Sequence, residues 1–311
     1  MTNDPYAGLS PRAADVRRYF TPTPPPPRLR GPVIVWSLGL VCLLYALVTD
    51  RAAGGFLVVG IVAGAKGAHT HLTRLKRYRQ ARAWAEPKPA DSWMDQLLYV
   101  EGRESVVGTG RARLNLVRAD EAAAEQGDEG SGPLVVFGLP PVPPAGFRMA
   151  IGRDGILRAT HYDIFVFFLT KWHLCMYRGL LEMETGFTVQ DETKEFAYRD
   201  VVSLATASDR RTMPKPPEHN GQGQPAPGTG PGGFPAAPVL HWTTQQFFRL
   251  RVASDHISTL VGLHFEDQLG TSGFGNGEEV EMTLQRIRAK LREYTERREE
   301  SGSGDAFGSH L

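Results

Sequence analysis

Cysteine is scarce in this chain, because the 311 residues include only Cys42 and Cys175. The two lie far apart and in separate apolar runs, so they do not indicate the disulfide framework of a small secreted domain, and a reducing compartment is expected. Catalytic signatures are lacking as well, since the sequence has no GxSxG, P-loop or HExxH pattern. Its glycine-rich stretch at residues 229–233 has no strand signal before it and no helix signal after it, unlike a phosphate-binding loop. We therefore expect no enzymatic activity.

Potential metal ligands and an excess of charge are also lacking. His69 lies near His71, and His161 lies near Asp163, but neither pair has the third and fourth ligands that a metal site usually needs. We expect no metal and no other cofactor. The formal net charge is +1, which gives no signal for nucleic-acid binding.

Charge is almost absent from residues 32–65, where Asp50 and Arg51 are the only charged side chains. Residues 32–49 would form a helix of about 27 Å, close to the roughly 30 Å of a bilayer's hydrocarbon core. Residues 52–71 would form a second span of about 20 residues, with Lys66 extending its ammonium group towards the headgroups. The sequence therefore predicts a two-helix transmembrane hairpin at residues 32–71.

Basic residues flank this hairpin on both sides and determine its predicted orientation. Positive charge near a span favours the cytoplasmic side, so both ends, including the large C-terminal part, are expected in the cytoplasm of a multi-pass cell-membrane protein. Six basic residues at the end of the hairpin and after it are also predicted to contact anionic headgroups at the membrane surface. They are Lys66, Arg74, Lys76, Arg77, Arg79 and Arg82. Gly60 and Gly64 have GxxxG spacing and are predicted to pack helices, within the hairpin or between copies.

Two less apolar regions border the hairpin. Residues 1–31 are interpreted as a disordered, proline-rich segment, in which Ser10 could cap a short helix that begins at Pro11. Residues 72–132 are interpreted as a basic juxtamembrane helix at residues 72–84 and a linker region. This linker includes a strand-like alternation, RARLNLVR, and an acidic loop at residues 120–132.

The remainder is dominated by strand signals, which predict a domain at residues 133–298. Short apolar runs such as LVVFG, DIFVFFLTK and HLCMYRG are separated by turn residues, as in an antiparallel meander. Residues 164–169 are apolar at every position, which predicts a strand that is buried on both faces. Residues 207–238, rich in proline and glycine, are expected to be a disordered insertion, and residues 299–311 a disordered tail.

A helix with one apolar stripe is expected near the C-terminus. Val280, Leu284, Ile287, Leu291 and Tyr294 recur at steps of four and three residues. Asn276 is the expected N-cap, and Glu278, Glu279 and Glu281 suit the positive first turn.

This order of elements, together with particular residues, resembles bacterial PH-like and GRAM-like domains. The stretch LTKWHLCMY, from Leu169, resembles a strand-turn-strand motif of these domains, and FAYRDVV, from Phe196, resembles the strand that follows. The resemblance implies a PH-like antiparallel β-barrel with a C-terminal capping helix. The complete fold prediction is thus α+β, mainly β, with the transmembrane hairpin preceding the barrel. The family's phosphoinositide-binding cluster of lysine and arginine is absent, since Arg148, Arg153 and Arg158 are five residues apart.

A binding-type fold without catalytic motifs predicts an interaction protein. We expect a membrane-anchored cytoplasmic module that recruits or scaffolds protein partners, so that its partners are the lipid bilayer and an unknown membrane or cytoplasmic protein. The alternative is a lipid-sensing or lipid-handling protein that binds anionic headgroups, and an unrecognised enzyme is a more distant one.

Overall fold

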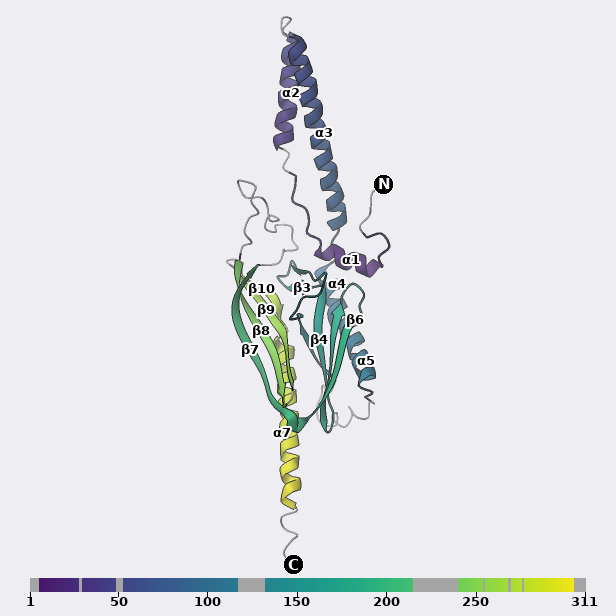
Figure 1. Ribbon diagram of the computed structural model, residues 1–311, viewed down its shortest axis with the longest axis vertical. Helices are drawn as coiled ribbons and strands as arrows, with labels where there is room; N and C mark the ends of the chain where they lie inside the picture. The colour runs from purple at the N-terminus through teal and green to yellow at the C-terminus, as the bar shows by residue number, and fades with distance from the viewer. Residues whose placement is uncertain are drawn as a thin grey trace, which may run out of the picture. The chain divides into compact units, whose positions relative to one another are not determined.

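The chain folds into two compact units that are interleaved in sequence (Figure 1). The computed structural model describes residues 6–27, 30–48, 53–116, 132–214, 240–253, 255–267, 270–275 and 277–304. Unit 1 comprises Met1–Gly8 and Thr21–Lys88, and unit 2 comprises Leu9–Phe20 and Pro89–Leu311. A short N-terminal segment therefore belongs to the larger unit, although unit 1 separates it from the rest of that unit in the sequence.

Unit 1 is a pair of packed helices, α2 (Arg30–Val48) and α3 (Ala53–Ala85). They approach each other closely at Gly39, where an added Cβ would lie 2.6 Å from the backbone nitrogen of Gly64 and 3.0 Å from the carbonyl oxygen of Gly60. At Gly67 an added Cβ would lie 2.9 Å from the backbone nitrogen of Trp36. Glycine permits this backbone-to-backbone packing because it has no side chain.

The predicted transmembrane hairpin at residues 32–71 is not supported by these helices. Within the part of the chain that the structure describes, no helix has a stretch that is both long enough and apolar enough to cross a membrane. A span needs about 20 consecutive, mainly apolar residues, whereas α2 has 19 residues and begins with Arg30, and α3 becomes polar and basic from Lys66 onwards. This finding overturns the transmembrane hairpin and, with it, the predicted location as a multi-pass cell-membrane protein. The predicted turn at Asp50 and Arg51 lies outside the described residues.

Unit 2 is built on two four-stranded antiparallel sheets. The first has the order β1 (Leu134–Gly138), β4 (His161–Leu169), β5 (His173–Glu182) and β6 (Thr188–Ala197). The second has the order β10 (Gly270–Gly275), β9 (Asp255–Asp267), β8 (Leu240–Val252) and β7 (Val201–Pro214). A two-stranded hairpin, β2 (Met149–Ile151) and β3 (Leu157–Ala159), completes the described strands.

The two open sheets replace the predicted PH-like barrel, because neither sheet closes on itself in the described residues. They are joined by a short bridge, in which the backbone nitrogen of Leu139 donates to the carbonyl oxygen of Leu260 over 2.7 Å. Buried side chains of the second sheet pack against those of the first and complete the apolar core between the two sheets. The α+β class and the dominance of strands agree with the sequence prediction, but the barrel closure does not.

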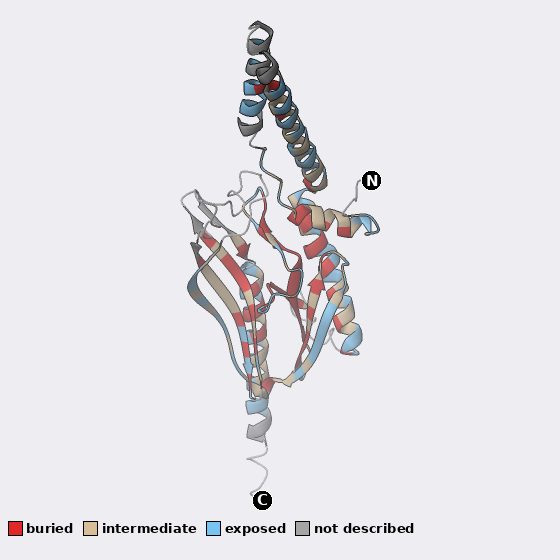
Figure 2. Ribbon diagram, turned by 45° about the horizontal axis from the view of Figure 1, so that its top comes forward, coloured by how far each residue is buried: buried red, intermediate tan, exposed pale blue. Residues whose placement is uncertain are grey.

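Strand β4 is the centre of the core, as the apolar run at residues 164–169 predicts. Its first eight residues are all buried. Ile164, Val166 and Phe168 face one apolar cluster, while Phe165 and Phe167 face a second cluster on the other side of the sheet. The prediction that residues 164–169 are covered on both faces is confirmed for this strand (Figure 2).

Helices cover the two sides of the first sheet. On one side lie α1 (Pro11–Phe20) and a continuous helical segment made of α4 (Asp91–Gln96), the π-helical turn η1 (Leu97–Gly102) and α5 (Arg103–Arg113). They contribute Tyr19, Leu98 and Val106 to the first cluster. On the other side lies α7 (Gly277–Gly304), whose buried Val280, Leu284 and Ile287 belong to the second cluster.

Several local predictions can be compared with these elements. The apolar stripe of α7 is confirmed, and α1 begins as predicted, with Ser10 accepting a bond from the backbone nitrogen of Ala13 over 3.2 Å. The strand-like alternation RARLNLVR is wrong, because Arg111 to Arg113 complete α5 and Asn115 follows in a left-handed conformation with φ of 50°. The helix prevails here because Gly110 lets α5 pack directly on Tyr177 of β5.

Other predicted segments continue further than expected or lie outside the described residues. The strand expected across FAYRDVVSLAT is interrupted by a 3-10 turn, η2 (Tyr198–Asp200), before β7 begins. Strand β7 then runs to Pro214, into the predicted insertion at residues 207–238, and α7 runs to Gly304, into the predicted tail. Residues 215–239, most of the acidic loop and Asn276 lie outside the described residues.

Candidate functional site

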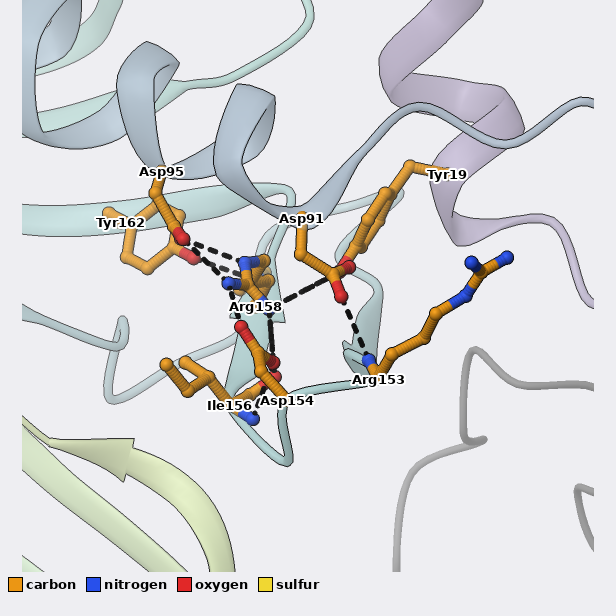
Figure 3. Close-up of polar contacts among 9 residues, drawn as sticks. Tyr19, Asp91, Asp95, Arg153, Asp154, Ile156, Arg158 and Tyr162 are labelled. Carbon is orange, nitrogen blue, oxygen red and sulfur yellow. Dashed lines mark hydrogen bonds and ion pairs between the residues drawn. The ribbon is translucent and has the colours of Figure 1, made fainter.

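A group of charged side chains in unit 2 surrounds Arg158 (Figure 3). This arginine leaves β3 with a side chain that is only 3% exposed. Its Nε and Nη2 atoms donate to the two oxygens of Asp95 over 2.8 and 2.7 Å, and its Nη1 and Nη2 atoms donate to Asp154 over 3.0 and 2.7 Å. A third carboxylate, that of Asp91, lies 3.9 Å from Nη1.

Asp91 connects this group to α1 and to the β2–β3 turn. The Tyr19 hydroxyl donates to Asp91 Oδ1 over 2.7 Å, and the backbone nitrogen of Arg153 donates to Asp91 Oδ2 over 2.9 Å. Gly152 leaves the space for the guanidinium, since a Cβ there would lie 2.2 Å from Arg158 Nη1. The polar network therefore fastens α1, α4 and the β2–β3 hairpin to one another.

The shifted pKa values in this network lie away from neutrality. Burial would lower the pKa of Arg158, but its bonds with Asp154 and Asp95 outweigh burial and raise it. The same bond from Arg158 lowers the pKa of Asp154, and burial raises the pKa of Tyr19. A general acid or base works best when its pKa is near the working pH. These three groups instead keep one protonation state around neutral pH, which suits a structural clamp.

The pair His161 and Asp163 also has separate structural partners. His161 Nδ1 lies 3.0 Å from the Thr160 hydroxyl, and its Nε2 lies 3.9 Å from Glu182, while burial lowers the pKa of His161. Asp163 accepts two bonds of 2.9 Å from Arg178 and one of 3.2 Å from Thr259 of β9, which ties the two sheets together. In the described residues, no three histidine, cysteine or acidic side chains are placed to bind a metal ion.

The predicted surface residues of unit 1 follow one another along the second half of α3. All six are exposed: Lys66, Arg74, Lys76, Arg77, Arg79 and Arg82. Arg82 pairs with Glu86 over 2.7 Å. Gly60 and Gly64, predicted to pack helices, both lie beside Gly39 of α2 at the contact within the hairpin. Whether the six basic residues contact headgroups stays a prediction.

Exposed apolar side chains gather on the other half of this helix pair. They include Ile34 at 65%, Leu38 at 60% and Val62 at 59% exposure. Among the side chains that the structure describes here, the exposed large apolar ones are Val33, Ile34, Val35, Trp36, Leu38, Leu40, Val41 and Leu44 of α2 with Val58, Ile61, Val62 and, within the basic half, Leu72 of α3. We call these side chains the apolar surface of the hairpin. A large number of exposed apolar side chains on one helix pair marks an interaction site in a folded protein.

Sequence reasoning missed the Arg158 network. Arg158 was grouped with Arg148 and Arg153 by their regular spacing, although the three have different environments. The available signal was the spacing of Asp91 and Asp95 by four residues, which places two carboxylates on one face of a helix. Their partner could not be found in this way, because it lies 63 residues further along the chain.

Comparisons with known proteins add no relative. No protein family, no curated protein and no solved structure matches the chain. They therefore do not identify a PH-like or GRAM-like domain, and this family resemblance stays a prediction.

Proposed function

We propose that the protein is an interaction module that recruits a protein partner through the α2–α3 hairpin. The observation that carries the proposal is the apolar surface of the hairpin, where large side chains such as Leu38 and Val62 are about 60% exposed. Water contact with apolar area costs roughly 25 cal/mol per Å², so covering this surface would be strongly favourable. A helical partner fits best, because helices bury such surfaces by packing side chains into the grooves between ridges.

The positive charge on the same hairpin indicates which charge the partner should carry. The basic half of α3, from Lys66 to Arg82, contains no acidic residue. A partner that covers the apolar half and extends along α3 would meet these exposed cations. We therefore expect helices with an apolar face and an acidic flank, since complementary charge raises the association rate and excludes wrong partners.

Unit 2 is held together by its own internal contacts. Its Arg158 network, its link from Asp163 to Thr259 and its two apolar clusters hold the sheets and helices in one arrangement. The protein needs no catalytic centre for such a role. The proposal retains the recruiting function expected from the sequence, without the transmembrane anchor.

Site-specific photo-crosslinking in cells would test the proposal. A photoreactive amino acid replaces Leu38 or Ile61 on the hairpin, and Val142, an exposed residue of unit 2, serves as the control position. We expect both hairpin positions to crosslink one and the same protein, which Val142 does not reach. The crosslink should disappear when Ile34 and Val62 are changed to serine. Crosslinks to unrelated proteins, or to no protein, would contradict the proposal.

A second candidate function, association with anionic lipid headgroups, is favoured by the exposed basic residues of α3. Each basic residue near an anionic lipid surface contributes about 1 kcal/mol at most. Flotation of the purified chain with vesicles would distinguish the two candidates. Binding to anionic but not neutral vesicles, lost when Lys76, Arg77 and Arg79 are changed to glutamine, would favour lipid. Equal recovery with and without vesicles would exclude it and leave the protein partner.

A further inference from the structure

Three turns of unit 2 are fastened together at one end of the two sheets. They are the β4–β5 turn, η2, and the turn between β8 and β9. The Tyr198 hydroxyl of η2 donates to the carbonyl oxygen of Thr170 in the β4–β5 turn over 2.8 Å. The backbone nitrogen of Ala253 donates to the carbonyl oxygen of Asp200 over 2.9 Å. Residues from distant parts of the sequence therefore share one surface here.

Trp172 is exposed on the β4–β5 turn. It is 58% exposed, whereas tryptophan is on average a highly buried residue. The Thr170 hydroxyl accepts hydrogen bonds from the backbone nitrogens of Trp172 and His173 over 3.3 and 2.9 Å, so the turn has a defined shape. The ammonium group of Lys171 lies 4.8 Å from the centre of the indole ring. A partner would bind this ring without the entropic cost of ordering the turn that carries it.

Val202 is a second exposed apolar residue at this end of unit 2. The pairing of β7 with β8 shifts between Val201 and Ser203, so Val202 has no opposite residue in the described register. A bulge of this kind redirects a side chain, and Val202 is 60% exposed. Because it follows η2 by two residues, and η2 is bonded to the β4–β5 turn, it belongs to the same surface as Trp172.

The charge around these two apolar residues is mainly positive. Lys171 and Arg199 are exposed, and the side chain of Arg199 is 68% exposed. Arg251, exposed near the end of β8, lies opposite Ser203, the residue after Val202. Among the described residues, neither Lys171 nor Arg251 has an ion pair within the chain.

The two carboxylates of the turns already have basic partners. Asp200 lies 3.7 Å from Arg199, and Asp255 pairs with Lys194 over 2.5 Å. The surface therefore keeps an excess of positive charge. We call its five exposed residues the Trp172 surface, and they are Lys171, Trp172, Arg199, Val202 and Arg251.

Helix α7 continues past these turns (Figure 1). The ring of Tyr294 in α7 lies 5.7 Å from the ring of Tyr198 in η2, and the helix then runs on to Gly304. Residues 295–304 extend the helix by about 15 Å at 1.5 Å per residue. A flat bilayer would meet this end of α7 before it reached Trp172, whereas a folded protein can fit beside the helix.

We propose that the Trp172 surface docks a partner protein whose facing surface has an apolar pocket bordered by carboxylates. Tryptophan and arginine are over-represented among the residues that dominate the free energy of protein–protein binding. Trp172 fills the apolar pocket, and Val202 adds apolar contact beside it. Lys171 and Arg251 attract the carboxylates, because complementary charge raises the association rate and excludes wrong partners.

This surface goes beyond the function proposed for the hairpin, because it uses only residues of unit 2. Loss of hairpin binding would leave it intact, and its own failure would leave the proposed function of the hairpin untouched.

Site-specific photo-crosslinking of the full chain in cells tests the proposal. A photoreactive amino acid replaces His173, which is exposed and leaves Trp172 in place, and Val189 of β6, 51% exposed, is the control position. Mass spectrometry identifies the crosslinked segment of the partner. The variants are Trp172→Ala, Lys171→Glu with Arg251→Glu, and the matched control Arg103→Glu, an exposed arginine of α5.

We expect position 173 to crosslink one protein, at a segment with acidic residues beside apolar ones, and position 189 not to crosslink it. Trp172→Ala should lower the yield about tenfold or more, as the truncation of a central aromatic side chain does. The charge-reversed variant should also lower the yield, because two attractive contacts become repulsive. Arg103→Glu should crosslink like the unchanged chain.

The hairpin variant with Ile34 and Val62 changed to serine should still crosslink through position 173. Loss of the crosslink in that variant would mean that position 173 only lies near a protein held by the hairpin, and would overturn the proposal. So would an undiminished crosslink in Trp172→Ala or in the charge-reversed variant, and so would a crosslink to no protein. The unfolding temperature of each variant shows that it is folded.

Discussion

Single buried polar side chains hold unit 2 together where apolar packing alone would not specify an arrangement. Arg158 satisfies its donors with two carboxylates from different elements, and Asp163 satisfies its oxygens with Arg178 and Thr259. Buried charge is costly unless it is paired and hydrogen-bonded. Each of these residues therefore restricts how the elements that contact it can be placed relative to one another.

Replacing Arg158 tests the network at the residue scale. We expect Arg158→Leu to lower the free energy of unfolding by about 2–4 kcal/mol, because carboxylates that are partly buried lose their counter-charge. The reduction is moderated by water, since Asp95 and Asp154 are about a third exposed. Urea unfolding followed by circular dichroism measures it.

Arg153→Leu is the matched control for that experiment. Arg153 contributes a backbone nitrogen to the network, over 2.9 Å to Asp91, so its side chain should be dispensable. We expect a change within about 0.5 kcal/mol. Equal destabilisation by the two substitutions would contradict the importance of the Arg158 guanidinium.

His161 predicts a pH dependence of stability. Burial lowers its pKa in the folded state, against the weaker attraction of Glu182 and Glu184, whereas an unfolded histidine has a pKa of about 6.5. Between these two pKa values the unfolded chain binds more protons. The contribution of His161 is therefore complete above about pH 6.5 and is lost as the pH falls through the folded pKa.

The measurement is the free energy of unfolding between pH 5 and pH 8 for the unchanged chain and for His161→Gln. We expect the unchanged chain to lose more stability on acidification than the variant, which cannot take up the proton. His173→Gln, at an exposed position, should retain the full pH dependence. Parallel curves for the unchanged chain and His161→Gln would refute the assignment.

At the scale of elements, close packing depends on which face of a helix is in contact. In unit 1 the contact falls on Gly39, whose added Cβ would collide with the Gly64 backbone, while an added Cβ on Gly64 itself would meet nothing within 4 Å. GxxxG spacing marks a helix as suited to close contact but does not say which glycine is essential.

Alanine substitutions at these two glycines should have opposite effects. Gly64→Ala should stabilise the helix pair by about 0.5–1 kcal/mol, because alanine reduces the backbone freedom of the unfolded chain. Gly39→Ala should separate α2 from α3, because its methyl group would lie 2.6 Å from a backbone nitrogen. Amide hydrogen exchange in both helices measures the difference, and equal protection in the two variants would disprove it.

The apolar stripe of α7 gives a second prediction for an element. Leu284→Asp should destabilise unit 2 by roughly 3–5 kcal/mol, since it places an unpaired charge in an apolar cluster. The control is Met282→Asp, two residues away, because Met282 is 46% exposed. It should change the free energy of unfolding by less than about 1 kcal/mol. Thermal unfolding of both variants measures the difference. Equal losses in the two variants would show that the stripe of α7 is not buried.

At the scale of the whole molecule, the two units divide the sequence unevenly. Helix α1 precedes unit 1 in the chain but places Val16, Tyr19 and Phe20 in the apolar cluster of unit 2. Arg12 and Arg17 add bonds to Glu101 and Glu184 over 2.8 and 2.7 Å. The short segment Leu9–Phe20 therefore folds with the part of the chain that follows unit 1.

Complementation by a peptide tests this arrangement. The fragment 89–311 lacks α1, so it should be less stable than the same unit in the full chain by several kcal/mol, through lost apolar burial and an exposed cluster. A synthetic peptide of residues 9–20 added in excess should raise its unfolding temperature. The peptide with Tyr19→Ala and Val16→Asp should not, and equal stabilisation by both peptides would show that α1 does not belong to this core.

Much of the secondary structure could be read from local patterns. The step of four and three residues in α7, the apolar run 164–169 within β4 and the Ser10–Pro11 start of α1 each follow from a pattern or a cap that acts over a few residues. Errors arose where local preference and packing disagree. RARLNLVR alternates like a strand, yet Gly110 against Tyr177 makes helix the better-packed choice.

The sequence by itself determined the strand-rich character of residues 133–298, the amphipathic helix after them, and the concentration of apolar and then basic side chains along α2 and α3. Only the tertiary structure decided that the strands form two open sheets, that α1 belongs to unit 2, and that Arg158 meets Asp95. The physical reason is range. Periodicity and capping act between neighbours in the chain, whereas sheet order and charge pairing depend on contacts between residues tens of positions apart. Many arrangements of the chain could provide such contacts, and the packing of the whole unit selects one of them.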